Sequence, residues 1–140
     1  MRVLVDTSVW SLALRRNARE LSRAERSLAG LLRDLVAEGR VAMVGPIRQE
    51  ILSGVRDEKT FERLRVRLGA FPDEEIGTGD YEEAARCSNR CRAAGITGSA
   101  VDSLVCAVAL RRGLAILTTD RDFTRYARVL PLRLLDRSTA

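Results

Sequence analysis

The sequence predicts an α/β fold with a parallel sheet, because short apolar runs alternate with longer amphipathic segments. Runs at residues 2–5, 41–44 and 114–117 have the length and composition of buried strands. The segments between them carry apolar residues at helical spacing, so helices separate each strand from the next. Strands joined in this way form a parallel sheet that helices cover on both faces. Residues 132–135 are expected to add a last strand at the edge of this sheet.

The helices carry recognisable signals at their ends. Ser22 and Glu25 match a capping box and Gly39 supplies a stop, so a helix is predicted over residues 22–38. Its leucines recur at helical spacing and form an apolar stripe that faces the core. Further helices are expected after Gly45-Pro46 and near residues 57–68, 80–94 and 99–112.

Length and composition indicate one globular domain. The chain has 140 residues, of which 46% are hydrophobic, so we expect a single domain over residues 1–140. No apolar run approaches the roughly 20 residues that a membrane helix needs. The first strand begins at residue 2, which leaves no room for a signal peptide, and a cytoplasmic protein is the expectation. Cys87, Cys91 and Cys106 are odd in number and lie in helical segments, so buried thiols are expected rather than disulfides.

The chain contains no histidine, which excludes Ser-His-Asp triads, Cys-His pairs and imidazole bases. Proton transfer must then use carboxylates, Lys, Tyr, Cys or metal-activated water. The 24 basic and 19 acidic residues give a net charge of +5, which suits a polyanion such as nucleic acid, although many basic proteins bind none. The arginines that could follow a phosphate backbone, or simply form a solvated face, are Arg15, Arg16, Arg19, Arg121 and Arg125.

Five acidic residues occupy positions that can converge. Asp6 ends the first apolar run, and Glu50 follows the second on a helix. Asp120 and Asp122 follow the third run, and Asp102 lies in the first turn of a predicted helix. Ligands of parallel sheets bind at the carboxyl ends of the strands, so these acids are expected to meet at one edge. A single acid in a first turn more often offsets the helix dipole, and the whole set therefore carries the prediction.

Carboxylates gathered in this way repel one another unless a cation lies among them. Oxygen-only ligation is what Mg²⁺ and Mn²⁺ select. Such a cation lowers the pKa of a bound water and offsets charge on a scissile phosphate. The sequence therefore predicts a metal-dependent enzyme that acts on phosphate esters. Neighbouring hydroxyls either orient the acids or cap strand and helix ends, and they belong to Thr7, Ser8, Thr118 and Thr119.

Four segments resemble the motifs of the PIN-domain nucleases. They are VLVDTSVW with Asp6, GPIRQEIL with Glu50, AVDSLVCAVALRRG with Asp102, and AILTTDRDF with Asp120 and Asp122. All four occur in order and together span almost the whole chain. The short length without an added domain is similar to that of the VapC toxins of bacterial toxin–antitoxin pairs.

The resemblance implies a three-layer α/β/α sandwich with a central parallel sheet. It also implies an endoribonuclease that depends on Mg²⁺ or Mn²⁺, forms homodimers, and is the toxin of a type II pair blocked by a small antitoxin. The catalytic acids carried over by position are Asp6, Glu50, Asp102, Asp120 and, as a less constant fifth, Asp122. Among these, the metal ligands that the resemblance implies are Asp6, Asp102 and Asp120.

Other classes of α/β protein also place Asp at strand ends. A haloacid-dehalogenase-like phosphatase carries Asp-x-Asp directly after the first strand, whereas here Thr7 and Ser8 follow Asp6. A receiver domain needs an acidic pair near the first strand and a late Lys, and the only Lys is Lys59. The remaining alternative is a non-catalytic RNA-binding or partner-binding domain on the same fold, and the intact set of acids argues against it.

Overall fold

The structure, a computed structural model, describes residues 1–14 and 17–136. Its centre is a three-stranded parallel sheet in the order β2-β1-β3. The middle strand β1 (Val3–Val5) lies between β2 (Val41–Ala42) and β3 (Ala115–Leu117). Every residue of the middle strand and of β3 is buried, as expected for apolar runs that helices cover on both faces. The predicted parallel sheet is therefore confirmed.

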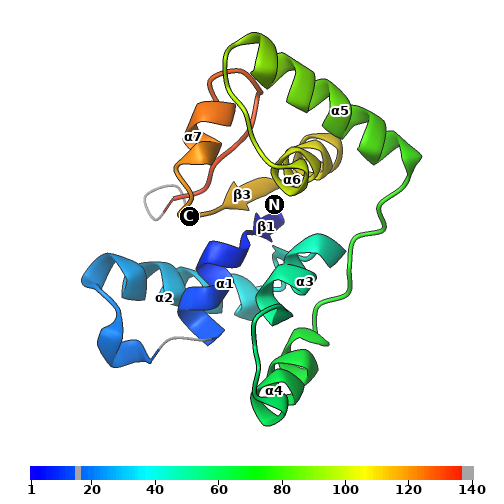
Figure 1. Cartoon of the computed structure of the whole chain (residues 1–140). Helices are drawn as coiled ribbons and strands as arrows, with labels where there is room; N and C mark the ends of the chain where they lie inside the picture. Colours follow the sequence, from blue (N-terminus) through cyan, green and yellow to red (C-terminus); the bar gives the residue numbers. More distant parts are fainter. Residues whose placement is uncertain (15–16, 137–140) are drawn as a thin grey trace.

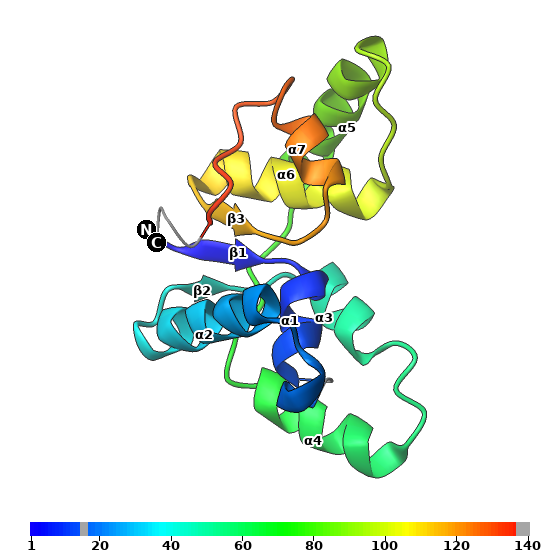
Figure 2. The same cartoon turned by 90° about the vertical axis from the view of Figure 1, so that its left-hand side faces the viewer.

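Helices cover the sheet on two sides, which gives the three-layer arrangement that Figures 1 and 2 show. In chain order they are α1 (Thr7–Leu14), the 3₁₀ helix η1 (Ala18–Glu20), α2 (Arg23–Ala37), α3 (Gly45–Leu52), α4 (Glu58–Leu68), α5 (Thr78–Ala93), α6 (Ala100–Arg112) and α7 (Asp122–Tyr126). Helices α1 to α4 form one group, in which α1 packs against α2 and α3. Helices α5 to α7 form the other group, in which α5 packs along α6.

Most of the predicted helix ends are confirmed. Ser22 Oγ accepts from the Glu25 backbone N–H at 3.1 Å, and Glu25 Oε1 accepts from the Ser22 N–H at 2.9 Å, so the capping box forms. Gly39 follows α2 with a left-handed φ of 68°, which stops the helix. Helix α5 begins two residues before its expected start at Asp80. The Asp80 carboxylate turns back to accept from the N-cap backbone N–H at 2.9 Å, and this allows the earlier start.

The expected edge strand at residues 132–135 is not formed, and that prediction is wrong. The segment lies beside β3 and makes one isolated parallel bridge, between Ile116 and Leu134. Two backbone hydrogen bonds of 2.9 and 2.8 Å join it to Ile116. Pairing does not extend towards the amino end, because the next donor in the ladder, the Leu114 N–H, donates instead to the Ala109 carbonyl oxygen at the end of α6.

The second predicted strand, at residues 41–44, is shorter than expected. Only its first two residues pair with β1, and Met43 then makes an isolated parallel bridge to Asp73. The chain turns at Gly45-Pro46 into α3, as predicted, with Pro46 in the first turn. The early turn brings α3 close to the end of β1, where a site at the carboxyl edge of the sheet would lie.

One large core fills the space between the sheet and the helices. It includes Cys87, Cys91 and Cys106, which are buried free thiols, as predicted. Burial raises the pKa of all three thiols, so they act as small apolar groups. Among the described residues, no helix has the length and apolar character needed to cross a membrane.

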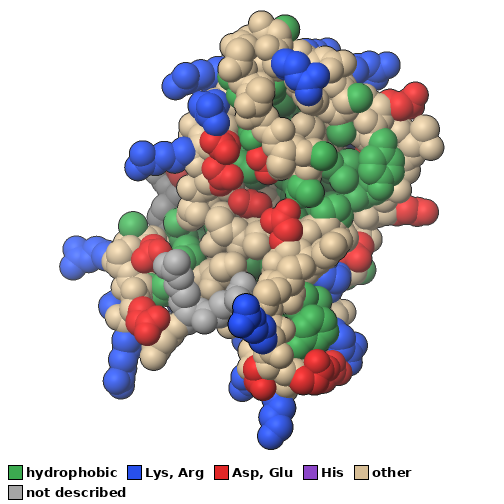
Figure 3. All heavy atoms as spheres, viewed as in Figure 1, with side chains coloured by type: hydrophobic (Ala, Val, Ile, Leu, Met, Phe, Trp, Pro, Cys, Tyr) green, Lys and Arg blue, Asp and Glu red, His purple; other side chains and the backbone are tan. Residues whose placement is uncertain are grey.

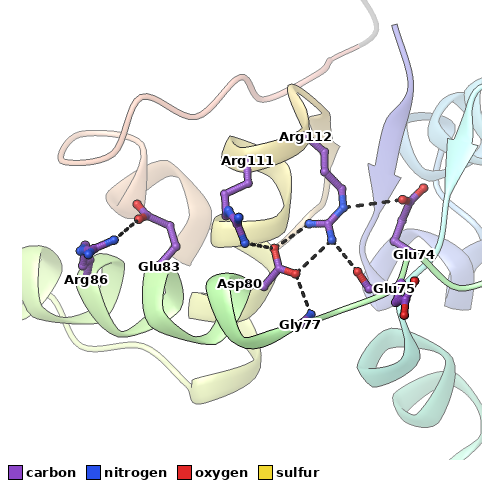
Figure 4. Close-up of polar contacts among 8 residues, drawn as sticks. All are labelled: Glu74, Glu75, Gly77, Asp80, Glu83, Arg86, Arg111 and Arg112. Carbon is purple, nitrogen blue, oxygen red and sulfur yellow. Dashed lines mark hydrogen bonds and ion pairs between the residues drawn. The ribbon is translucent and has the colours of Figure 1, made fainter.

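A buried ion-pair network joins the start of α5 to the end of α6 (Figure 4). Asp80 is 2% exposed and accepts from Arg111 Nη1 at 3.0 Å and from Arg112 Nη1 and Nη2 at 2.8 and 3.0 Å. Arg112 also donates to the Glu75 carbonyl oxygen at 2.5 Å. The hydrogen bonds from Arg112 are the largest cause that holds the pKa of Asp80 well below its usual range. The network anchors the helix whose first turn carries Asp102.

Candidate active site

The structure brings the predicted acids together at the carboxyl edge of the sheet. Asp6 directly follows the last residue of β1, and Asp120 follows β3 after two threonines. Asp102 lies in the first turn of α6 and Asp122 in the first turn of α7. Figure 3 shows a group of acidic side chains in the middle of one face, with basic side chains projecting around its margin.

Asp102, Asp120 and Asp122 form a compact group of carboxylates. One carboxylate oxygen from each lies within 4.8 Å of the other two. The Asp122 backbone N–H donates to Asp120 Oδ1 at 2.9 Å, which turns the Asp120 side chain towards α7. A set made only of oxygen donors fits Mg²⁺ or Mn²⁺, whereas a softer metal would require thiolate or imidazole ligands. The donors present therefore fit the cation that the sequence predicts.

Asp6 is held by two hydroxyl groups. Its Oδ2 accepts from Thr118 Oγ1 at 2.7 Å and from Ser8 Oγ at 3.0 Å. Ser8 Oγ in turn accepts from the Thr119 N–H at 3.0 Å, and Thr118 Oγ1 accepts from the Asp120 N–H at 3.0 Å. These bonds tie the ends of β1 and β3 together. Ser8 and Thr118 therefore do both of the things that the sequence left open, because each hydroxyl donates to the Asp6 carboxylate and accepts from a backbone N–H.

Glu50 approaches the same edge from α3. Thr7 Oγ1 donates to Glu50 Oε2 at 2.9 Å, and Thr7 is the neighbour of Asp6 in the chain. The buried side chains of Ile47 and Ile51 fix α3 against the core on either side of Glu50. Glu50 itself is exposed, so its carboxylate is accessible to water beside the strand-end acid.

The environment of Asp102 disfavours its charged form. Burial is the largest cause that raises the pKa of Asp102, and the nearby charges of Asp120 and Asp6 raise it further. The hydroxyls of Tyr126 and Ser99 act in the opposite direction. Ser99 also caps α6, because its Oγ accepts from the Asp102 N–H at 3.0 Å. A divalent cation among these acids would favour the ionised form of their carboxylates.

Sequence patterns do not identify Tyr126 as a site residue. Its hydroxyl donates to Asp102 Oδ2 at 2.6 Å, across 24 positions of the chain. The only signal in the sequence is its spacing from Phe123, which indicates that both aromatic rings share the buried face of α7. That spacing predicts a core residue and says nothing about a contact with an acid.

The predicted arginines are less closely tied to the acids. Arg125 Nη2 pairs with Asp122 Oδ1 at 2.5 Å within α7, so it offsets part of the acidic charge. Arg15 and Arg16 lie outside the described residues. The arginines that are exposed near the starts of short helices are Arg19 and Arg121. A role for any of these arginines in binding a phosphate backbone stays a prediction.

Comparison with known proteins identifies the family. A profile of the PIN domain matches residues 3–129. The chain belongs to the PIN-domain family. This PIN-domain chain is 35% identical over 136 residues to VapC ribonuclease Mb1587 of Mycobacterium bovis, across 94% of its own length and 96% of that protein. It is similar to the same extent to Ribonuclease VapC11 of Mycobacterium tuberculosis.

Solved structures confirm the PIN fold. VapBC2 from Rickettsia felis, bound to a DNA fragment from its promoter, aligns with a TM-score of 0.76 and 14% identity over 96% of this chain and 98% of that chain. VapBC-1 from nontypeable Haemophilus influenzae aligns with a TM-score of 0.73 and 14% identity over 99% of each chain. At such identities these similarities establish the fold alone. All five predicted acids lie inside the residues matched to the PIN domain, and their individual roles stay predictions.

Proposed function

We propose that this PIN-domain protein is a metal-dependent endoribonuclease and the toxin of a type II toxin–antitoxin pair, with residues 1–140 forming one nuclease domain. The observation that carries this proposal is the convergence of five acids at one edge of the sheet in a chain without histidine. Full-length similarity to VapC ribonucleases supports RNA as the substrate. A cytoplasmic location, where RNA is available, is part of the proposal.

We assign the cation to Asp6, Asp102 and Asp120. Asp102 and Asp120 belong to the compact carboxylate group together with Asp122, and Asp6 is linked to that group through the Thr118 hydroxyl. When bound there, Mg²⁺ or Mn²⁺ supplies an activated water and a counter-charge for the scissile phosphodiester. The protein's own contribution is to hold the ligands in place before the cation arrives. Thr118 fixes Asp6 through its hydroxyl and Asp120 through its backbone N–H, so one side chain positions two of the proposed ligands.

Glu50 is the residue to which we assign proton transfer. The attacking water must lose a proton as the new bond to phosphorus forms, and no imidazole is present to accept it. Glu50 is exposed and is oriented by the Thr7 hydroxyl beside Asp6. It therefore lies next to the proposed cation ligands and remains open to solvent and substrate.

The same acids are the proposed target of a small antitoxin. A partner would block the site most directly by placing Arg or Lys among Asp6, Glu50 and Asp102, because a guanidinium group binds carboxylates through paired hydrogen bonds. The similarity of the fold to chains of VapBC structures supports a protein partner of this kind. Binding there would exclude both the cation and the RNA.

A homodimer is also proposed, with an apolar groove between α5 and α6 as its supporting feature. The groove has a volume of about 340 Å³ and is lined mainly by small and apolar side chains, including Tyr81, Val101 and Leu104. Tyr81 is 58% exposed, which is unusual for a large aromatic side chain. Covering this surface with a second copy would remove apolar area from water.

Expression of the chain alone is expected to arrest bacterial growth, and the Asp102→Ala change is expected to relieve that arrest. Removing one proposed cation ligand lowers cleavage without touching the rest of the surface. Growth curves of induced cultures with matched protein levels provide the measurement. If Asp102→Ala cells arrest as strongly as cells with the original chain, toxicity does not arise from this site and the toxin proposal fails.

Millimolar Mn²⁺ is expected to raise the melting temperature of the protein. A ligand at about 100 times its Kd stabilises the folded state by about 2.7 kcal/mol, which corresponds to roughly 8 °C for a chain of this length. Relief of repulsion among Asp102, Asp120 and Asp122 is the physical cause. Thermal unfolding with and without Mn²⁺ measures the shift. The exposed Asp34→Asn variant should show the same shift, and a double Asp102→Asn, Asp120→Asn variant should show none.

A further inference from the structure

The ring of Tyr126 connects α7 to the acidic site. Tyr126 is 2% exposed, and its hydroxyl donates to Asp102 Oδ2 at 2.6 Å. The Tyr126 hydroxyl is therefore a buried donor that reaches a proposed cation ligand from the side of the core.

Packing around the ring keeps this hydroxyl in place. Phe123 contacts Tyr126 edge to face, with ring centroids 5.2 Å apart. The ring also borders a cavity of about 10 Å³ that Cys91 and Cys106 line, which has room for about one water molecule and none for a displaced ring.

Gly98 provides the space that the hydroxyl occupies. A Cβ atom added at this glycine would overlap the Tyr126 hydroxyl oxygen and lie 2.8 Å from Cζ, closer than real Cβ contacts allow. Either the ring or the segment that leads into α6 would then have to move. Both movements shift the hydroxyl relative to Asp102, which lies four residues after Gly98. The absence of a side chain at residue 98 is therefore a condition of the contact.

We propose that Tyr126 is a positioning residue that holds the Asp102 carboxylate ready for cation binding, and that Gly98 makes room for it. The inference rests on the proposed function, because it assigns a partner to one of the proposed cation ligands. Tyr126 acts through Asp102 alone and does not touch substrate. Residues that hydrogen-bond to a metal ligand typically contribute about 10- to 100-fold in metal affinity or activity, and this range is the expected effect.

The Tyr126→Phe variant removes the hydroxyl and keeps the ring. Its apparent affinity for Mn²⁺, measured by calorimetry on the full chain, should fall by about 10- to 100-fold. Cleavage should need correspondingly more Mn²⁺ and should recover in large part at saturating metal, while the KM for RNA stays unchanged. The exposed Asp34→Asn variant is the control and should bind Mn²⁺ as the original protein does.

Gly98→Ala supplies a second and independent test. It keeps the Tyr126 hydroxyl but displaces it, so it should weaken Mn²⁺ binding in the same direction as Tyr126→Phe. Gly77→Ala is the matched control, because a Cβ at Gly77 meets no atom within 4 Å and its φ of −118° is ordinary for alanine. In the double variant that combines Gly98→Ala with Tyr126→Phe, the two losses of Mn²⁺ affinity should not add, because both changes break the same contact between Tyr126 and Asp102.

The outcomes separate this inference from the proposed function. If the original chain binds no Mn²⁺, the proposed function fails and the inference with it. If the original chain binds Mn²⁺ and folded Tyr126→Phe binds it equally well, only the role of Tyr126 is overturned. If Tyr126→Phe does not fold, or loses stability while its Mn²⁺ affinity is unchanged, the tyrosine is purely structural and the inference is equally overturned.

Discussion

Replacing Asp6 with Asn is expected to reduce RNA cleavage on the order of 1000-fold while leaving the fold intact. The Asp6 carboxylate is already oriented in the protein, since the hydroxyls of Ser8 and Thr118 both donate to its Oδ2. Asn keeps the shape and removes the charge, so it loses attraction for a divalent cation. Loss of one preorganised charged group at a reaction centre typically costs about 100- to 1000-fold.

The fold should survive this change, because Asn keeps the backbone contacts of Asp6 and can keep its side-chain contacts. Its carbonyl oxygen accepts from the N–H groups of Val9 and Trp10 at 3.0 and 3.3 Å, which starts α1. An Asn side chain can still accept from both hydroxyls through its amide oxygen. Circular dichroism and thermal unfolding should therefore match those of the original chain.

The measurement is the rate at which purified protein cuts total RNA in Mg²⁺, followed by mapping of the cut ends. EDTA should stop the original enzyme, and the exposed Asp34→Asn variant should cleave at the original rate. Ser8→Ala should lose less than Asp6→Asn does, roughly 10-fold, because one hydroxyl still orients the carboxylate. Full activity of Asp6→Asn, or cleavage that ignores EDTA, would show that the proposed chemistry is wrong.

The position of the acids could be predicted because it depends on where strands end and helices begin, which local sequence patterns indicate. Asp6 and Asp120 follow buried strands, and parallel strands end at one edge of a sheet. Asp102 and Asp122 then join them because their helices begin at that edge. The hydroxyls beside the acids were equally accessible to prediction, since Ser8 lies two residues from Asp6 and shares its turn.

The contacts that could not be predicted join elements whose relative placement is set by packing. Tyr126 meets Asp102 because α7 lies against α6, and Asp80 meets Arg112 because α5 lies along α6. These pairs are 24 and 32 residues apart, and no local pattern encodes either distance. Helix periodicity indicates which face of a helix is buried, but it does not identify the partner on the other side.

The segment at residues 132–135 is a case in which a local pattern predicts a strand that does not form. The run at residues 132–135 has the apolar composition of a strand. Its backbone pairs only around Ile116, since the next donor in the ladder, the Leu114 N–H, is used by the Ala109 carbonyl oxygen at the end of α6. Composition therefore indicates that the segment packs beside β3, while the backbone donors decide how much of a ladder it can make.

The largest loss of stability is expected from Asp80→Asn, at about 2–3 kcal/mol near pH 7. Asp80 is buried and accepts three hydrogen bonds from Arg111 and Arg112 and a fourth from the Gly77 N–H (Figure 4). Removing one partner of a fully buried ion pair typically costs about 3–5 kcal/mol. The cost is smaller here because the side chains of Arg111 and Arg112 are 46% and 24% exposed, so water can solvate them.

The difference between the two proteins should depend on pH in a defined direction. The pKa of Asp80 is lowered in the folded state, chiefly by Arg112, from about 3.9 in the unfolded chain. A carboxyl with a lowered pKa stabilises the fold fully above its unfolded pKa, and this contribution is lost as pH falls through the folded pKa. The original protein should therefore exceed Asp80→Asn by a constant amount above about pH 5, and this difference should shrink progressively as pH falls below about 4 towards the lowered folded pKa.

Urea unfolding of both proteins between pH 3 and 8 measures this difference, and Glu83→Gln is the matched control. Glu83 lies one turn further along α5 and pairs with Arg86 at 3.2 Å on the surface, as Figure 4 shows. Exposed pairs of this kind contribute only about 0.2–1 kcal/mol, so this variant should stay close to the original protein at every pH. An Asp80→Asn protein as stable as Glu83→Gln at pH 7 would mean that packing of α5 on α6, and not the buried ion pairs, holds the helix that carries Asp102.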